Sequence, residues 1–170
     1  MPHDWQQISE NHGPLVWSAI YRILQSHSES LDCFQDVMLE AFQKSKTEAI
    51  ENWAGYLKWM AVRRAIDRLR KNKRNRRFVD PNQDIETVAS NSNSPDTSFQ
   101  MEELLQRLRI ELAQMPNRQA EAFWLRFVEQ MSYSEIAHQM GIESNSVGVL
   151  IHRGRAQMRD ALADLQPNEL

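Results

Sequence analysis

SEIAHQMGIESNSVGVLIHRGRAQM, residues 134–158, decides the fold of the second half of the chain. Ile136, Ala137 and Met140 recur at helical spacing before Gly141, and a longer helical pattern follows that glycine. A short helix, a turn that contains glycine and a second helix form a helix-turn-helix, in which the second helix enters the major groove of DNA. We therefore expect a DNA-reading domain here. The alternative is an ordinary three-helix bundle with a solvated face.

Two glycines lie inside the second of these helices, where each costs roughly 1 kcal/mol relative to alanine. Gly154 falls on the predicted inward face, where a missing side chain lets a neighbouring helix approach closely. Gly148 falls on the opposite face, where it either leaves a gap or lets the helix backbone approach a groove. The other predicted inward positions are Val147, Leu150, Ile151 and Met158.

Charge is unevenly distributed along the 170 residues. The formal net charge is −3, yet the segment from Lys58 to Arg77 holds ten of the 20 basic residues and one of the 23 acidic residues. A basic stripe on an acidic body is typical of a protein that binds a polyanion such as DNA. This density argues against a protein-interaction module in which the stripe is only a solvated face.

Three helices are expected in the first half. Pro14 suits the first residue of the first helix, and Ser28 or Ser30 suits the cap of the second. The third is predicted over residues 53–70, and the basic run beyond it is either a helical extension or a flexible arm. Because no strand-like alternation occurs anywhere, we predict an all-α fold.

Residues 78–98 have no basic residue, four acidic residues, two prolines and a cluster of Ser and Asn. Such a segment cannot bury enough apolar surface to offset the entropy of ordering, so we expect an acidic flexible linker. It divides the chain into two small helical domains, predicted at 10–77 and 99–164. In the second domain, a helix that ends before Pro116 and a helix capped by Asn117 precede the helix-turn-helix.

Several function classes are disfavoured by what the sequence lacks. No set of nucleophile, base and orienting residue and no phosphate-binding glycine loop is recognisable, so we expect no enzyme activity from the chain alone. The five histidines lack ligand spacing, and we predict neither a metal nor a cofactor. Cys33 is expected to be a small buried residue rather than a redox sensor. No segment approaches roughly 20 consecutive apolar residues, which predicts no membrane span and a cytoplasmic location.

Three stretches carry a family resemblance: DCFQDVMLEAF (32–42), YLKWMAVRRAIDRLRKNKR (56–74) and MPNRQAEAFWLRFVEQMSYSEIAHQMGI (115–142). In this order they resemble the extracytoplasmic-function (ECF) group of the sigma-70 family of bacterial RNA polymerase sigma factors. The resemblance covers about residues 15–162. It implies a region 2 bundle of three or four helices and a region 4 helix-turn-helix domain, joined by a flexible linker.

The resemblance implies a subunit that binds core RNA polymerase and directs transcription initiation at promoter DNA. Region 2 would dock on the clamp helices of the largest polymerase subunit and recognise and melt the minus-ten element. Region 4 would bind the polymerase flap and read the minus-thirty-five element. An anti-sigma factor is a common partner in this family, and the short chain is compatible with one. The alternative is a polymerase-independent helix-turn-helix transcriptional regulator, which would leave the first domain unexplained.

Carried over residue by residue, the resemblance implies three sets of site residues. The polymerase-binding set is Asp32, Gln35, Asp36 and Glu40. The minus-ten set is Trp53, Arg63, Arg64, Asp67, Arg68, Arg70, Lys71, Lys73 and Arg74, with the loop from Lys46 to Trp53 placed to hold an extruded base. The minus-thirty-five set is Ser144, Asn145, Ser146, Val149, His152, Arg153 and Arg155.

The chain departs from the family pattern at four positions. Leu31 stands where an acid is usual, Arg64 stands where Asn is frequent, and Gly148 and Leu150 stand where Lys or Arg is frequent. Reading of the minus-thirty-five element is therefore expected to depend on His152, Arg153 and Arg155.

Three aromatic residues at the start of the third helix have two interpretations. Trp53, Tyr56 and Trp59 offer surfaces on which an unstacked base could lie. Large aromatic side chains also dominate the energetics of hydrophobic cores, and we favour core packing for Tyr56 and Trp59.

Overall fold

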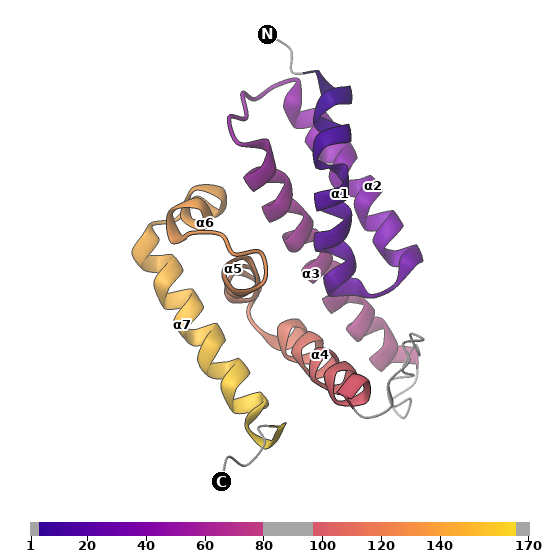
Figure 1. The fold of residues 1–170 in the computed structure, drawn as a ribbon, viewed down its shortest axis with the longest axis vertical. Coiled ribbons are helices and arrows are strands. Elements are labelled where there is room, and N and C mark those ends of the chain that lie inside the picture. The colour runs from indigo at the N-terminus through magenta and orange to yellow at the C-terminus, as the bar shows by residue number, and fades with distance from the viewer. Residues whose placement is uncertain (1–3, 80–96, 166–170) are drawn as a thin grey trace.

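The computed structural model describes residues 4–79 and 97–165, in which all regular structure is helical. A first bundle contains α1 (Trp5–Leu24), α2 (His27–Ser45) and α3 (Trp53–Val79). A second contains α4 (Thr97–Gln114), α5 (Asn117–Phe127), α6 (Tyr133–Met140) and α7 (Ser144–Ala161), followed by the 3-10 helix η1 (Ala163–Leu165) (Figure 1). The all-α prediction is confirmed. Residues 80–96 of the predicted linker lie outside the described residues, whereas its ends belong to α3 and α4.

The first helix begins well before the position that the sequence pattern favours. The prediction that it starts at Pro14 is wrong, because α1 starts at Trp5 and Pro14 lies inside it. The Asp4 carboxylate accepts hydrogen bonds from the first free N–H groups of the helix. Proline removes one hydrogen bond within the helix, and buried residues on both sides of it, Ile8 and Val16, offset that loss.

The second helix is capped two residues earlier than predicted. Ser26, rather than Ser28 or Ser30, occupies the N-cap position, and its hydroxyl accepts the Glu29 N–H at 3.4 Å. Ser30 is buried inside the helix. Serine followed three residues later by glutamate is a known helix-start signal, so the sequence did carry the information.

The extent of the third helix shows whether the basic run is a helical extension or a flexible arm. Its first turn is held by Asn52, whose side-chain oxygen accepts the Gly55 N–H at 3.0 Å. The helix continues to Val79, nine residues beyond the predicted end at Arg70. The basic run is therefore a helical extension.

The helix-turn-helix has the predicted form, with clear capping chemistry. The Ser132 hydroxyl accepts the Glu135 N–H at 3.1 Å, and the Glu135 carboxylate accepts the Ser132 N–H at 2.7 Å. This reciprocal pair starts α6 and lowers the pKa of Glu135. Gly141 ends α6 with a φ of +64°, in the left-handed region that glycine adopts without strain.

The predicted cap of α5 is wrong. Asn117 is the first residue of the helix, and Pro116 occupies the cap position without a side-chain hydrogen bond. The Pro116 carbonyl already accepts the Ala120 N–H at 3.0 Å, so the helical pattern begins one residue earlier than expected.

Gly154 has the packing role that the sequence indicates. It is buried, and a Cβ at this position would lie 3.1 Å from Phe123 Cβ on α5. The two helices also share a hydrogen bond at 3.0 Å between the amides of Gln119 and Gln157. The missing side chain thus lets α7 lie close against α5.

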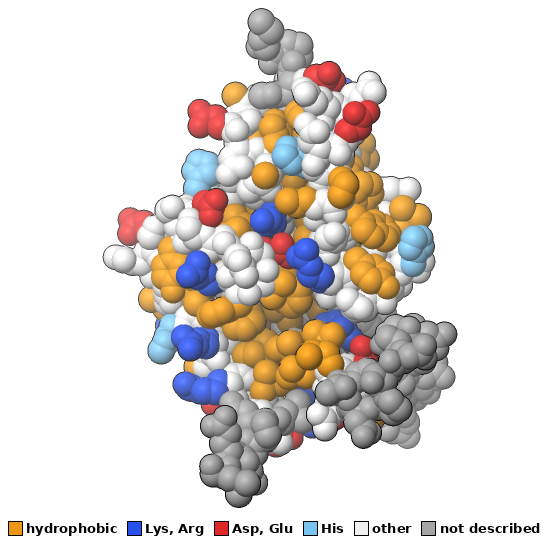
Figure 2. Space-filling model, in the orientation of Figure 1, with side chains coloured by type: hydrophobic (Ala, Val, Ile, Leu, Met, Phe, Trp, Pro, Cys, Tyr) orange, Lys and Arg blue, Asp and Glu red, His pale blue; other side chains and the backbone are white. Residues whose placement is uncertain are grey.

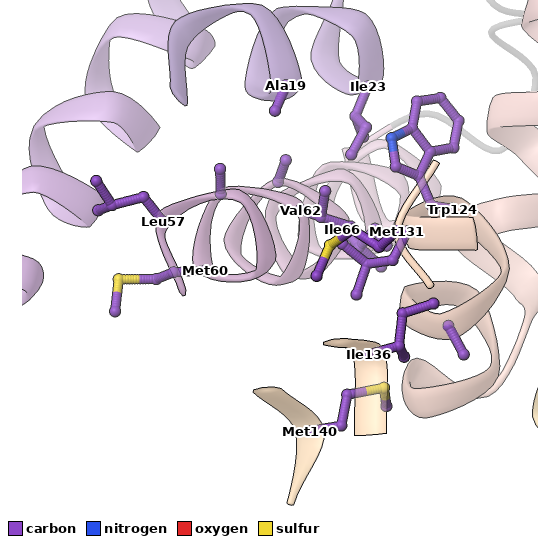
Figure 3. Packing of buried hydrophobic residues seen from close by; sticks show 14 of the residues in the cluster. Ala19, Ile23, Leu57, Met60, Val62, Ile66, Trp124, Met131, Ile136 and Met140 are labelled. Atoms are coloured by element: carbon purple, nitrogen blue, oxygen red, sulfur yellow. The ribbon is translucent and has the colours of Figure 1, made fainter. Parts of the chain in front are cut away.

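The two bundles share one hydrophobic core, because α5 and α6 lie against α3 (Figure 1). Figure 3 shows Val62 and Ile66 of α3 beside Trp124 of α5 and Met131 of the following loop, with Ile136 of α6 below them. All five residues are buried. The two helical bundles, which the sequence predicts as separate domains, are therefore packed together along α3.

Candidate polymerase-docking and nucleic-acid interfaces

The acidic residues of α2 and the arginines of α3 lie on facing helices and pair with one another. Arg64 forms an ion pair with Glu40, and this hydrogen bond raises the pKa of the guanidinium group. Arg68 reaches three carboxylates of α2: Asp36 at 2.9 Å, Glu29 at 3.3 Å and Asp32 at 3.7 Å. The predicted polymerase-binding and minus-ten residues therefore contact one another where α2 packs on α3. Their spacing along the chain did not indicate this contact.

These ion pairs leave the acidic face accessible. The side chains of Asp32 and Asp36 are 67% and 64% exposed, and Gln35 beside them is exposed. Surface pairs of this kind contribute about 0–1 kcal/mol, so another partner can compete for the carboxylates. Leu31 and Leu39 are also exposed on α2 and add apolar surface that the predicted set omits.

A cavity of about 380 Å³ lies where α2 faces the second half of α3. Cys33 lines it but is otherwise buried, as predicted, and burial raises the pKa of its thiol to about 11. The cavity brings most of the minus-ten set together: it is lined by Arg64, Asp67, Arg68, Arg70, Lys71 and Arg74. Lys73 is half-buried on the same helix.

Arg63 points toward the second bundle. Its guanidinium carbon lies 5.4 Å from the ring centroid of Trp59, a cation–π arrangement. Burial raises the pKa of Glu121 on α5, and the positive charge of Arg63 partly offsets that rise. Arg63 itself remains exposed.

Polar contacts also tie the two bundles together. The Arg70 guanidinium donates to the Met115 carbonyl just before α5. Arg22 of α1 lies 2.6 Å from the carboxylate of Glu129, which follows α5, and the Lys58 ammonium donates to the Glu129 carbonyl at 3.5 Å. The second bundle thus covers part of the α3 surface that the sequence assigns to promoter DNA.

The aromatic residues at the start of α3 are largely in the core. Trp53 and Tyr56 are each 8% exposed, and their ring centroids lie 6.0 Å apart. Burial raises the pKa of Tyr56 to about 12. Trp59 is half-buried, and Trp53 also packs on Trp5. Core packing is therefore confirmed for Tyr56, while a base contact by Trp53 would need this packing to open.

The loop between α2 and α3 is exposed over residues 46–49. Lys46 lies 4.1 Å from the ring centroid of Phe42, and Lys44 pairs with Glu48 at 3.1 Å. The loop thus has the accessibility that an extruded base requires, and that role stays a prediction.

The outward face of α7 presents the predicted reading residues to solvent. Ser144, Asn145, Ser146, Val149, His152, Arg153 and Arg155 are all exposed. Figure 2 shows Lys and Arg side chains gathered over the α7 side of the molecule. Sequence reasoning missed Tyr133, the first residue of α6, which is exposed and lies beside this face. The one sequence signal for Tyr133 is its position directly after Ser132, the residue that caps α6.

Residues 4–79 and 97–165 contain neither a metal-ligand cluster nor a membrane-spanning helix. Within these ranges, no three His, Cys, Asp or Glu side chains are grouped so that they could hold a metal ion. None of the helices described is both long and apolar enough to cross a membrane.

Family models match both bundles. "Sigma-70 region 2" matches residues 8–75, and "Sigma-70, region 4" matches residues 102–158. The chain belongs to the sigma-70 family of RNA polymerase sigma factors. Within that family, its relatives place it among the ECF sigma factors.

Curated relatives are similar over most of this chain. The ECF RNA polymerase sigma factor SigE of Mycolicibacterium smegmatis is 26% identical over 94% of this chain, which spans 62% of the length of that relative. The ferric citrate uptake sigma factor FecI of Escherichia coli is 29% identical, with 81% of this chain and 78% of FecI covered. SigV of Bacillus subtilis is also 29% identical, with 82% and 81% covered.

A solved structure has the same fold. The sigma factor RpoE of Bartonella quintana, in complex with the anti-sigma factor NepR, superposes with a TM-score of 0.60 at 20% identity. The match covers 94% of this chain and 97% of RpoE. At this identity the likeness concerns the fold, which is that of a two-region sigma factor.

Proposed function

We propose that this chain binds core RNA polymerase and directs transcription initiation at specific promoters. The observation that carries the proposal is the division of its surface: exposed carboxylates lie on α2, and a polar, basic reading face lies on α7. A regulator that only reads duplex DNA through α7 would leave this acidic face, with Leu31 and Leu39 exposed on the same helix, without a partner. In this role the chain is a transcription factor of the cytoplasm and has no enzyme activity by itself.

The polymerase-docking surface is proposed to be the outer face of α2. Asp32, Gln35, Asp36 and Glu40 supply its polar groups, and the neighbouring Leu31 and Leu39 supply apolar area. Protein interfaces commonly combine an apolar centre with a polar rim, which suits this arrangement. Docking on the polymerase clamp helices would then compete with the ion pairs between α2 and Arg68.

The minus-ten surface is proposed to be the basic side of α3. Lys71 and Arg74 are exposed and suit phosphate contacts, which add affinity without reading sequence. Arg63 and the loop over residues 46–52 are the proposed contacts to an unpaired base. Because Arg70 binds the Met115 carbonyl, promoter contact through this part of α3 requires the second bundle to move away.

The minus-thirty-five surface is proposed to be α7, with Asn145 and Arg153 as base readers. An Asn amide can pair with an adenine edge and an Arg guanidinium with a guanine edge, each through two hydrogen bonds. An anti-sigma factor is a further proposed partner, and the complex of RpoE with NepR supports it because the folds agree.

Run-off transcription with core polymerase tests the proposal. The template pool carries randomised promoter DNA, and the reactions differ only in the presence of this chain. A defined transcript that appears only with the chain is expected. Equal transcripts in both reactions would refute the proposal.

A polymerase-independent regulator is the competing function. It predicts tight, sequence-specific binding of duplex DNA by the purified chain alone. The proposal instead predicts weak binding without core polymerase, because part of α3 is covered in the packed arrangement.

A further inference from the structure

The reading face of α7 is hollowed at its centre. Gly148 contributes no side chain there, and a Cβ at this position would lie 3.7 Å from Cε2 of Tyr133, at ordinary contact distance. The hollow has a volume of about 490 Å³ and is open to solvent. It is lined by Tyr133, Ser144, Asn145, Gly148, Val149, His152 and Arg153.

The lining of this hollow includes apolar groups that are unusual on a DNA-reading face. Tyr133 is 42% exposed and Val149 is 49% exposed, although both border serine, asparagine and arginine side chains. Single exposed apolar residues need no explanation. Here Tyr133 of α6 and Val149 of α7 both border the hollow, next to Gly148, which has no side chain.

The ring of Tyr133 is held in place from outside the hollow. The guanidinium carbon of Arg126 lies 5.3 Å from the ring centroid, and the Arg126 side chain also donates to the Met131 carbonyl at 3.1 Å. A ring fixed in this way gives the hollow a stable wall.

We propose that this hollow receives the 5-methyl group of a thymine in the minus-thirty-five element. The major-groove edges of the four base pairs present donors and acceptors, and the thymine methyl is their one apolar group. Tyr133, Gly148 and Val149 are then specificity-determining residues. The inference rests on the proposed function, because it places α7 in the major groove of promoter DNA.

Gly148 is the position on which this recognition depends. Any side chain there would project toward the Tyr133 ring and occupy the hollow. A basic side chain here would instead reach toward a phosphate or a base acceptor. With glycine here the proposed contact is apolar, and Asn145 on the rim can read the adenine edge of the same or a neighbouring base pair.

The test compares thymine with uracil, which lacks only the methyl group. A minus-thirty-five element is first selected from a randomised pool with the full chain bound to core polymerase. Each thymine of the selected duplex is then replaced singly by uracil, and the dissociation constant of the holoenzyme is measured. Burying one methyl group changes affinity by about fourfold. We expect that loss at one thymine position.

Three variants locate the effect. Gly148→Ala places a methyl group against the Tyr133 ring, at the spot proposed for the thymine methyl, so its affinities for the thymine and uracil duplexes should become equal within about twofold. Tyr133→Ala removes the wall and should do the same. Tyr133→Phe keeps the ring and should retain the fourfold ratio, which separates the apolar contact from any hydrogen bond of the hydroxyl. Thermal melting should show that Gly148→Ala is at least as stable as the parent.

Two results would overturn the inference. One is a selected element that has no thymine whose methyl matters to the parent holoenzyme. The other is a fourfold uracil penalty that survives unchanged in Gly148→Ala. Either result, obtained with a holoenzyme that starts transcription at a defined site, leaves the proposed function standing. Absence of any defined start would instead refute the proposed function itself.

Discussion

Gly148→Ala and Gly154→Ala add the same methyl group to the same helix, and we expect opposite effects on the free energy of unfolding. Alanine favours a helix interior over glycine by about 1 kcal/mol, so both variants receive that gain. The surrounding space differs. The new Cβ lies 3.7 Å from Tyr133 Cε2 at position 148 and 3.1 Å from Phe123 Cβ at position 154.

The close contact that alanine would make at position 154 can be relieved only by moving the backbone. Phe123 Cβ is attached directly to the α5 backbone, so relief requires α5 and α7 to separate rather than a side-chain end to rotate. Overpacking in a close-packed core costs about 1–3 kcal/mol. After the helix gain is subtracted, Gly154→Ala should be destabilised by up to about 2 kcal/mol, while Gly148→Ala should be stabilised by about 1 kcal/mol.

Urea unfolding of the full chain, followed by circular dichroism, measures both values. The two variants serve as controls for each other, because helix propensity changes equally in both. The slope of the unfolding free energy against urea should stay that of the parent, since the surface exposed on unfolding is the same. If Gly154→Ala is as stable as Gly148→Ala, the close approach of α5 and α7 is not what requires glycine there.

Three further predictions concern the titratable groups. Burial raises the pKa of Glu121, so the charged carboxylate destabilises the fold at neutral pH. Glu121→Gln should therefore raise the free energy of unfolding at neutral pH. Below about pH 4 the carboxyl is protonated in both the folded and the unfolded chain, so urea titrations there should show no such gain. Because the Cys33 thiol is buried with a pKa of about 11, a thiol reagent should modify it far more slowly in the native chain than in urea, and equal rates would contradict its burial. Asp32→Lys with Asp36→Lys should weaken capture of core polymerase but leave minus-thirty-five DNA binding unchanged, whereas Glu10→Lys, an exposed reversal on α1, should alter neither.

Local signals in the sequence predict much of this fold. Gly141 and the apolar spacing around it locate the turn between α6 and α7, and apolar spacing predicts α3 over residues 53–70, although the basic run beyond them left the end of that helix open. Where a local rule failed, a neighbouring contact decided the outcome. Pro14 suggested a helix start, but the buried Ile8 and the Asp4 cap extend α1 past it.

Contacts between distant segments could not be predicted in the same way. Arg68 and Asp36 appear in the sequence as members of two separate surfaces, and only the packing of α2 on α3 makes them partners. Likewise, nothing in the sequence of α5 shows that Trp124 packs beside Val62 and Ile66 of α3. Tyr133 lies beside Gly148 because α6 packs against α7, and spacing along one helix does not contain that information.

The contacts that join the two bundles have a thermodynamic consequence for any partner that needs the bundles apart. A partner that needs the bundles apart can bind only the separated fraction of molecules, so its apparent affinity falls in proportion to that fraction. The contacts of Arg22 with Glu129 and of Arg70 with the Met115 carbonyl thus act as a built-in competitor. A substitution that loosens this joint would strengthen such binding without touching the partner, and one that tightens it would weaken the binding of every partner that needs the bundles apart.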